Sequence, residues 1–392
     1  MTRVLLLAAD MDPRQGGPPK VVYGSACALA RAGVSVEIAA TGPTETADAT
    51  RAAWPLLADL GIPLHIFPRT GPATLGYSSA MDRFVAREIS GFDAIHVHGV
   101  WEQCFARATR RARAAGVRTF VSPHGMLDRW QLGQSRIKKQ IALHLFGTGA
   151  MLRHADAVLY GTRHEADEAR PLALPSPARV MPNGVEPEPL ADRAAVAAML
   201  RERFPQMHGW SRTVLFLSRL HPKKGLDMLV EAFARTRQSH SGAGLLAIAI
   251  PQDADYEATL RARIEQLGTE RLVLATDLVG PEARAALAAA DVFCLPSHQE
   301  GLSIAILEAM GAGLPVLITT ECHLDELEDR GAAKVVPDTV AGLTAGLAAL
   351  LDLDRESLAA MGRRGASIVA SEYSWERIAA DLAALYSGGA GK

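Results

Sequence analysis

The sequence predicts an α/β protein built from two doubly wound parallel-sheet domains. Short apolar runs alternate with amphipathic stretches along the chain, and a segment rich in Pro at 182–189 interrupts this alternation. The length of 392 residues suits two domains of roughly 150 residues or more. Alternation of this kind is typical of β-α units with parallel strands. Ligands of such sheets bind at the carboxyl ends of the strands, so we expect the two domains to face a cleft.

The predicted strands form two series, one on each side of a linker near 183–190. In the first series we expect strands at 3–9, 34–40, 62–67, 93–98, 117–122, 155–160 and 178–182. In the second series we expect them near 213–218, 244–250, 271–275, 291–295, 315–319 and 334–336. The chain from about residue 339 onward is rich in Ala and Leu and is predicted to be helical.

Composition and charge exclude several classes of protein. With 48% hydrophobic residues the chain is neither disordered nor fibrous, and its net charge of −2 argues against a general nucleic-acid binder. The four cysteines are far apart, without the spacing of a zinc site, and are expected to be reduced and buried. No apolar segment reaches the roughly 18 residues of a membrane-spanning helix. We therefore expect a cytoplasmic protein, able to associate with the inner face of the plasma membrane.

A basic loop follows the first strand of the second series. Its sequence, SRLHPKKGLD at 218–227, places Arg219 and Lys224 between a strand and a predicted helix. Arg suits bidentate binding of phosphate, and Lys supplies a compact positive charge. Together with a helix N-terminus, these side chains can balance the charge of a diphosphate. The alternative is a solvated basic loop.

The most informative segment is PSHQEGLS at 296–303, which is followed by a predicted helix. The backbone N–H groups of Gly301, Leu302 and Ser303 are then free to hold an anion or sugar hydroxyls. Glu300 lies in the loop, and Glu308 lies within the apolar helix. Burial of an unpaired carboxylate is costly, so we expect Glu308 to have a polar partner. The alternative is a helix N-terminal acid followed by a solvated one.

Three segments of the first half also end predicted strands. Gly16 and Gly17, in DPRQGGPPK at 12–20, let backbone N–H groups approach an anion, although a tight turn is an equally good interpretation. No GxGxxG fingerprint is present, which disfavours a nicotinamide dehydrogenase. His124, in SPHGM at 122–126, is placed to contact a ligand. His96 and His98, in HVHGVW at 96–101, lack a third residue at a metal-ligand spacing, so we predict no metal site.

These motifs, in their order along the chain, resemble those of the GT-B glycosyltransferases of family 4. The resemblance rests on the Gly16–Gly17 loop, PNGV at 182–185, Arg219 with Lys224-Gly225, and the pair Glu300 and Glu308. It extends from the first strand to YSWE at 373–376. A departure is PQD at 251–253, where the family often has a Gly-rich turn.

The resemblance implies an N-terminal acceptor-binding domain (1–185), onto which the helix at 374–388 packs, and a C-terminal nucleotide-sugar domain (190–372). Arg219 and Lys224 would grip the donor diphosphate, and Glu308 would bind the ribose. Glu300, with the N–H groups of Gly301, Leu302 and Ser303, would hold the transferred sugar. Gly16 and Gly17 would approach the diphosphate, and His124 would lie near the anomeric carbon. The implied reaction retains the anomeric configuration and needs no metal or other cofactor beyond the nucleotide-sugar donor.

The implied donor is GDP-mannose or a UDP-hexose, and the implied acceptor is a lipid-linked glycan of bacterial exopolysaccharide, capsule or O-antigen synthesis. The basic stretch at 129–141 mixes cations, Trp and aliphatic residues, which favours contact with an anionic membrane or an ordinary surface element equally. Rival functions on the same scaffold are a nucleotide-sugar 2-epimerase, a phosphorylase and a catalytically silent protein. A phosphorylase would need a dedicated lysine for pyridoxal phosphate, which we do not find.

Overall fold

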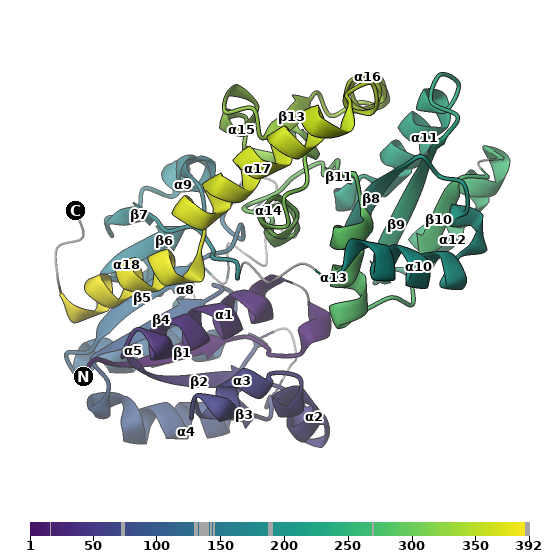
Figure 1. The fold of residues 1–392 in the computed structure, drawn as a ribbon. Coiled ribbons are helices and arrows are strands. Elements are labelled where there is room, and N and C mark those ends of the chain that lie inside the picture. Colours follow the sequence, from purple (N-terminus) through teal and green to yellow (C-terminus); the bar gives the residue numbers. More distant parts are fainter. Residues whose placement is uncertain are drawn as a thin grey trace. The chain divides into compact units, whose positions relative to one another are not determined.

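The computed structural model describes residues 1–392 except 16, 72–74, 129–131, 133–140, 142, 144–145, 187–190, 269 and 389–392. The chain divides into two units. Unit 1 comprises Met1–Gly184 and Tyr373–Lys392, and unit 2 comprises Val185–Glu372. The chain therefore enters unit 2 just after the Asn183-Gly184 turn and returns to unit 1 for its last helix (Figure 1).

Unit 1 contains a seven-stranded parallel sheet with the order β3-β2-β1-β4-β5-β6-β7. Its strands are β1 (Arg3–Ala8), β2 (Ser35–Thr41), β3 (Leu64–Phe67), β4 (Ala94–His98), β5 (Arg118–Ser122), β6 (Ala157–Tyr160) and β7 (Ala178–Val180). Its helices are α1 (Gly17–Arg31), α2 (Ala47–Ala52), α3 (Pro55–Asp59), α4 (Ser79–Glu88), α5 (Gln103–Ala114), α8 (Thr148–Arg153), α9 (Arg163–Ala169) and α18 (Trp375–Ser387). The strand order reverses between β1 and β4, which makes this edge the expected ligand position.

Unit 2 contains a six-stranded parallel sheet with the order β10-β9-β8-β11-β12-β13. Its strands are β8 (Arg212–Leu220), β9 (Ala243–Pro251), β10 (Leu272–Ala275), β11 (Val292–Leu295), β12 (Val316–Thr319) and β13 (Ala333–Val336). Its helices are α10 (Arg193–Arg203), α11 (Leu226–Thr236), α12 (Ala254–Gln266), α13 (Gly280–Ala289), α14 (Ile304–Gly311), α15 (Glu326–Asp329), α16 (Val340–Leu351) and α17 (Arg355–Glu372). Here the strand order reverses between β8 and β11.

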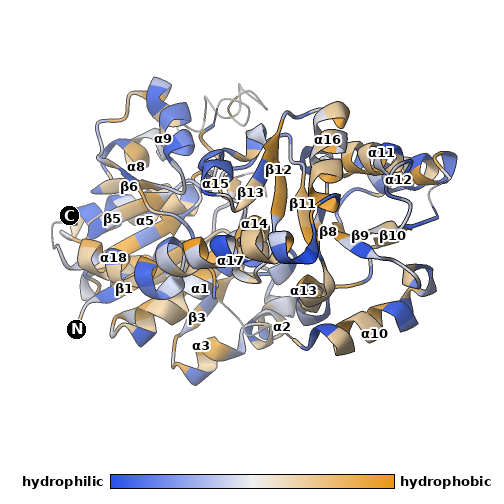
Figure 2. Cartoon of the chain, turned by 45° about the horizontal axis from the view of Figure 1, so that its top comes forward, coloured by the Kyte–Doolittle hydropathy of each residue, from blue (hydrophilic) through white to orange (hydrophobic). Residues whose placement is uncertain are grey.

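The buried strands explain why the strand predictions agree with the structure to within two residues at most ends. Leu5, Leu6 and Leu7 of β1 are fully buried, as are the central residues of β11 and β12, which Figure 2 colours hydrophobic. Continuous apolar runs are expected of parallel strands covered on both faces. Strands β3, β6 and β7 are each two residues shorter than predicted. Strand β3 begins after Pro63, which has no N–H to donate to a sheet.

The last helix, α18, packs on α1 within unit 1. Side chains at Gly24 and Gly184 would meet the ring of Trp375 at 2.3 and 2.5 Å, so only glycine leaves room for this ring. Farther along, Tyr386 is fully buried, and its hydroxyl lies 2.6 Å from His96 Nδ1. Arg118 donates hydrogen bonds to the backbone carbonyls of Leu385 and Tyr386. The start of the helix is therefore held against α1 and Gly184, and its end is held against strands β4 and β5.

None of the helices among the described residues has both the length and the apolar character that a membrane span requires. All four cysteines are buried, as the sequence predicts, and none of them forms a disulfide.

Candidate functional site

In unit 2, two loops meet where the strand order reverses. The first follows β8 and makes a short 3-10 turn, Pro222–Lys224, before α11 begins. The second follows β11 and leads through Pro296 to Ser303, the N-cap of α14. A backbone hydrogen bond joins the two loops, because His298 N–H donates to the Lys223 carbonyl. A second one anchors the loop after β11, because Glu300 N–H donates to the Glu321 carbonyl.

The centre of this site is a buried ion pair between Lys224 and Glu300. The Lys224 Nζ donates to Glu300 Oε1, and Ser297 Oγ donates to the same oxygen at 2.6 Å. The two charged side chains are only 10% and 9% exposed. A buried charge is tolerated when it is paired and hydrogen-bonded, so this arrangement keeps a buried lysine at the strand ends. The two residues, 76 positions apart in the sequence, are therefore brought together.

Gly225 explains how the two loops approach so closely. Its φ of +65° is in the left-handed region, and a Cβ here would lie 2.1 Å from the Pro296 carbonyl oxygen. Glycine is the residue that tolerates both conditions. Gly225 thus permits the close approach of the two loops, and Lys224 supplies the positive charge.

Arg219 lies one strand residue before the end of β8, half-buried, where β8 pairs with β9. Its Nη1 donates to Gln252 Oε1 at 3.1 Å. Gln252 belongs to the segment that replaces the Gly-rich turn, so this chain uses that position to hold the arginine. Burial and the positive charges of Arg219, Lys223 and Lys224 lower the pKa of His221. This region of the site therefore favours neutral or negative groups.

Glu308 occupies α14, and its Oε1 lies 3.7 Å from Arg284 Nε of α13. Arg284 is thus the polar partner expected for this carboxylate, whose side chain is 11% exposed. Gly301, Leu302 and Ser303 precede the first turn of α14, and the Ser303 side chain makes no capping bond. The N–H groups at this helix end thus lack the serine oxygen that often satisfies them.

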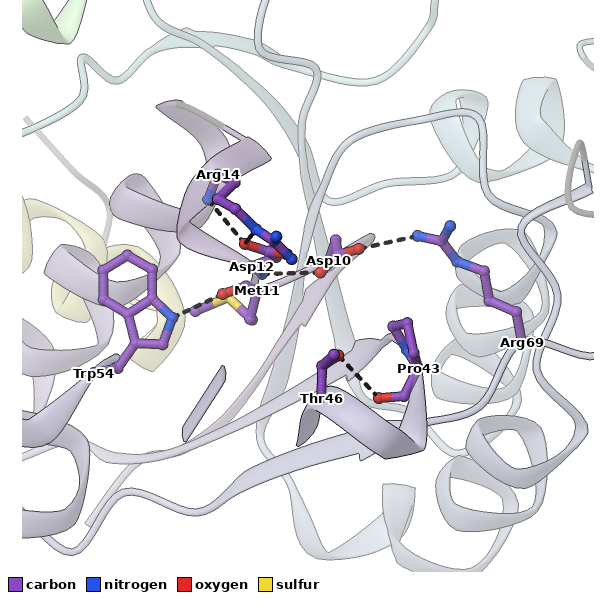
Figure 3. Close-up of polar contacts among 8 residues, drawn as sticks. All are labelled: Asp10, Met11, Asp12, Arg14, Pro43, Thr46, Trp54 and Arg69. Atoms are coloured by element: carbon purple, nitrogen blue, oxygen red, sulfur yellow. Dashed lines mark hydrogen bonds and ion pairs between the residues drawn. The ribbon is translucent and has the colours of Figure 1, made fainter. Parts of the chain in front are cut away.

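In unit 1, the turn between β1 and α1 is tightly held (Figure 3). Asp12 accepts hydrogen bonds from the Arg14 side chain, and Trp54 Nε1 donates to the Met11 carbonyl at 2.7 Å. Gly17 is the first residue of α1, whereas Gly16 lies outside the described residues. Helix α1 therefore begins at the second of these glycines, after the turn that follows β1.

His124 follows β5 with a φ of +52°, which is strained for a residue other than glycine. Its Nε2 lies 3.0 Å from Nδ1 of His98, which ends β4. Burial lowers the pKa of His124 to about 4 and that of His96 to about 3. Burial also holds the pKa of His98 well below its ordinary value, so the three imidazoles are neutral near pH 7. Among the described residues, no group of three or more His, Cys, Asp or Glu side chains has a metal-binding arrangement.

Glu165 is a residue that the sequence prediction missed. Its carboxylate accepts from the backbone N–H of Gly125 at 2.6 Å and of Gly161 at 2.7 Å, and it is 3% exposed. It therefore fixes the loop that carries His124. Thr162 and Glu165 have the spacing of an ordinary capping box, so the local sequence signals only a helix start.

Comparison with known families agrees with this geometry. Residues 16–184 match the family described as "Glycosyl transferase 4-like domain", and residues 211–353 match "Glycosyl transferases group 1". A GDP-mannose-dependent alpha-(1-6)-phosphatidylinositol monomannoside mannosyltransferase of Mycobacterium tuberculosis is 31% identical over 290 residues, which cover 71% of this chain and 72% of the relative. The chain belongs to the family 4 glycosyltransferases. It is thus a retaining, metal-independent hexosyltransferase with a nucleotide-sugar donor.

A further relative and two solved structures are also similar to this glycosyltransferase. The putative colanic acid biosynthesis glycosyltransferase WcaL of Salmonella typhimurium is 30% identical over 221 residues, or 53% of each chain. The crystal structure of Anabaena HepE with UDP and glucose has a TM-score of 0.79, covering 99% of this chain and all of that one at 18% identity. Sucrose-phosphate synthase from Thermosynechococcus elongatus has a TM-score of 0.74, covering 99% of both chains at 18% identity. These structures establish the GT-B fold expected from the sequence.

Proposed function

We propose that this enzyme moves a hexose from GDP-mannose or a UDP-hexose to a lipid-linked saccharide in bacterial surface polysaccharide synthesis. The observation that carries the proposal is the buried Lys224–Glu300 pair at the strand ends of unit 2. Arg219 lies close to the end of β8, the strand that precedes Lys224. The mycobacterial relative is a GDP-mannose-dependent enzyme that acts on a mannosylated phosphatidylinositol, and WcaL belongs to colanic acid synthesis. Both names support a saccharide acceptor attached to a carrier or polymer.

The proposed roles follow from charge and position. Arg219 and Lys224 stabilise the leaving diphosphate as its negative charge grows. Glu300 and the N–H groups of Gly301, Leu302 and Ser303 orient the transferred sugar, while Glu308 binds the ribose. The bond from the anomeric carbon to the phosphate oxygen breaks as the acceptor oxygen bonds on the same face. The acceptor proton passes to the departing phosphate oxygen. Gly17 and His124 keep their predicted roles near the donor.

A thermal-shift series with UDP, GDP, dTDP and ADP, and then with their sugars, tests the donor class without added metal. A ligand that binds only the folded state raises the melting temperature, by an amount set by its concentration relative to its Kd. We expect a shift with GDP or UDP and a larger one with the matching nucleotide sugar. Equal, negligible shifts for all four nucleotides would contradict the donor assignment.

Membrane contact is part of the same proposal. The stretch at 129–141 lies almost entirely outside the described residues, but α5 contains four arginines and no acidic residue. A hollow of about 420 Å³ between α5 and α8 is lined in part by Arg110, Arg113 and Phe146. Phe146 is 38% exposed and Ile141 40%. Cations beside exposed apolar side chains favour an anionic lipid surface.

Co-sedimentation with vesicles tests this contact. We expect binding to phosphatidylglycerol-containing vesicles at low salt and less binding to phosphatidylcholine alone. Replacement of both Arg110 and Arg113 by Gln should weaken it, whereas replacement of Arg263 and Arg235 in unit 2 should not. Equal sedimentation with both kinds of vesicle would refute the electrostatic contact.

A further inference from the structure

His98 and His124 lie at the ends of neighbouring strands in unit 1. His98 is the last residue of β4, and His124 lies just beyond the end of β5. Their side chains are joined by a hydrogen bond of 3.0 Å between His98 Nδ1 and His124 Nε2. The two ring planes differ by 14°, and the ring centroids lie 5.2 Å apart, so the rings meet edge to edge. This geometry places the shared proton close to the line between the nitrogens, as a hydrogen bond prefers.

This bond contains a single proton, because both imidazoles are neutral near pH 7. Burial holds the pKa of His98 well below its ordinary value and lowers that of His124 to about 4. A neutral imidazole has one N–H donor and one bare nitrogen, which accepts. The bond therefore has two alternative forms. Either His98 Nδ1 donates to His124 Nε2, or His124 Nε2 donates to His98 Nδ1.

The second nitrogen of His98 discriminates between these two forms. His98 is 4% exposed, and its Nε2 atom is buried without a hydrogen-bond partner among the described residues. If His124 were the donor, His98 would carry its own proton on Nε2, as a buried N–H group without an acceptor. If His98 is the donor, its Nε2 is a bare nitrogen. Buried N–H groups without an acceptor are especially rare in native proteins, so the packing favours donation by His98.

His96, the other histidine of β4, has no such constraint. Its Nδ1 lies 2.6 Å from the Tyr386 hydroxyl, and its Nε2 lies 2.8 Å from Ser122 Oγ. A hydroxyl group both donates and accepts, so these partners suit either tautomer of His96. The constraint on the position of the proton is therefore a property of the pair His98 and His124.

We propose that His98 is a positioning residue that holds His124 in the tautomer with its proton on Nδ1, so that His124 offers a hydrogen-bond donor to its ligand. The bond from His98 occupies Nε2 of His124, which leaves Nδ1–H as the polar group of this ring that is open to a ligand. Glu165 holds the same loop from its backbone, because its carboxylate accepts from Gly125 N–H at 2.6 Å. The ring and the backbone of this loop are therefore both fixed.

The inference rests on the proposed function, which places His124 near the anomeric carbon of the donor. In that position Nδ1–H donates to a hydroxyl of the sugar or to an oxygen of the leaving phosphate. It does not take the proton of the acceptor, because the bare nitrogen of His124 is already bonded to His98. This agrees with transfer of the acceptor proton to the departing phosphate oxygen.

Nitrogen-15 NMR of the full-length protein with labelled histidine tests the inference without any ligand, because protonated and bare ring nitrogens have well-separated chemical shifts. At pH 7 we expect His124 and His98 each to carry one proton, on Nδ1. The His98→Phe and His124→Phe variants assign the signals. In His98→Phe the donor to His124 Nε2 is lost, so His124 should become a mixture of both tautomers. His98→Asn, whose amide donates from nearly the same place, should retain the Nδ1–H form.

Turnover, measured as release of UDP or GDP from the nucleotide sugar, gives a second readout. His98→Phe should lower kcat about tenfold, the scale of one lost hydrogen bond, with unchanged affinity for the free nucleotide. His98→Asn should recover most of this loss. His208→Phe, at an exposed histidine of unit 2, is the matched control and should alter neither kcat nor the tautomer of His124.

The inference is overturned if His124 carries its proton on Nε2 in the unmodified protein, a result that does not depend on the folding of any variant. It is also overturned if His98→Phe leaves both the tautomer of His124 and kcat unchanged. Absence of nucleotide binding by the unmodified protein would instead overturn the proposed function, and the tautomer measured by NMR would stand.

Discussion

Two glutamates of the same chain illustrate how surroundings decide what a residue can do. Glu300 is buried beside Lys224 and Ser297, which supply a charge and a hydrogen bond. Glu102 is half-buried, its buried Oε2 atom has no hydrogen-bond partner among the described residues, and burial raises the pKa of its carboxyl group. The first carboxylate is therefore held in place by two side chains, whereas the second keeps one oxygen that receives no hydrogen bond from the described residues.

Replacement of Arg219 tests the proposed grip on the diphosphate. Arg219→Ala should reduce turnover by about tenfold to a thousandfold, the range for loss of a preorganised group that stabilises developing negative charge. Steady-state kinetics with the nucleotide sugar identified by thermal shift gives this ratio. The control is Arg235→Ala, which removes an exposed arginine paired with Glu231 in the same unit. Similar activity of both variants would contradict the proposed role of Arg219 in binding the diphosphate.

The lowered pKa of the buried His96 implies that the stability of the folded protein depends on pH. The folded-state pKa of His96 is about 3, whereas an unfolded histidine titrates near 6.5. Below pH 6.5 the unfolded chain binds the proton and the folded chain does not, so stability is full above pH 6.5 and falls as the pH falls toward 3. His96→Gln should lessen this loss by at most about 1.4 kcal/mol per pH unit. Denaturant unfolding at pH 5 to 7 measures it, with exposed His208→Gln as the control. An unchanged slope in His96→Gln would be contrary evidence.

At the scale of elements, the loops after β8 and β11 were predictable because apolar strands and turn residues delimit them locally. Lys224 and Glu300 could be assigned to one site from their places at strand ends. Partners that come from distant sequence could not be predicted. Nothing near His96 indicates Tyr386, which is 290 residues away, and nothing near Gly125 indicates Glu165. The unpartnered oxygen of Glu102 depends on three-dimensional packing and has no sequence signal.

Gly225 gives the prediction for the two donor loops. Gly225→Ala places a methyl group 2.1 Å from the Pro296 carbonyl oxygen, so the loops must separate and Lys224 must move relative to Glu300. We expect this variant to bind the nucleotide more weakly than the unmodified protein, as measured by titration calorimetry. Gly268→Ala is the matched control, since Gly268 also has a positive φ, of +56°, but open space around it. If both variants bind the nucleotide equally, the close approach is not needed for the site.

At the scale of the whole molecule, the sequence predicted two α/β units and the strand positions, but not the strand order. The position of α18 depends on two glycines, Gly24 and Gly184, that are far from Trp375 in sequence. Local patterns therefore establish the elements, while long-range packing establishes how the chain closes unit 1.

Gly24→Ala tests the packing of α18. Alanine normally stabilises a helix interior relative to glycine by about 1 kcal/mol, but here its Cβ would lie 2.3 Å from the Trp375 ring. We therefore expect a lower melting temperature. Trp375→Leu should also destabilise, and the double variant should be less destabilised than the two losses added together, because the clash is gone. Strict additivity would indicate that the ring and the glycine act independently.

The central claim is that unit 2 holds the donor diphosphate with a buried lysine, and titration calorimetry of Lys224→Met tests it most directly. The account predicts that this variant binds UDP or GDP at least about tenfold more weakly than the unmodified protein, on the scale of a lost charge-assisted contact. Lys334→Met, which removes the exposed lysine paired with Glu328 in the same unit, should bind normally. Unchanged nucleotide affinity in folded Lys224→Met would contradict the claim.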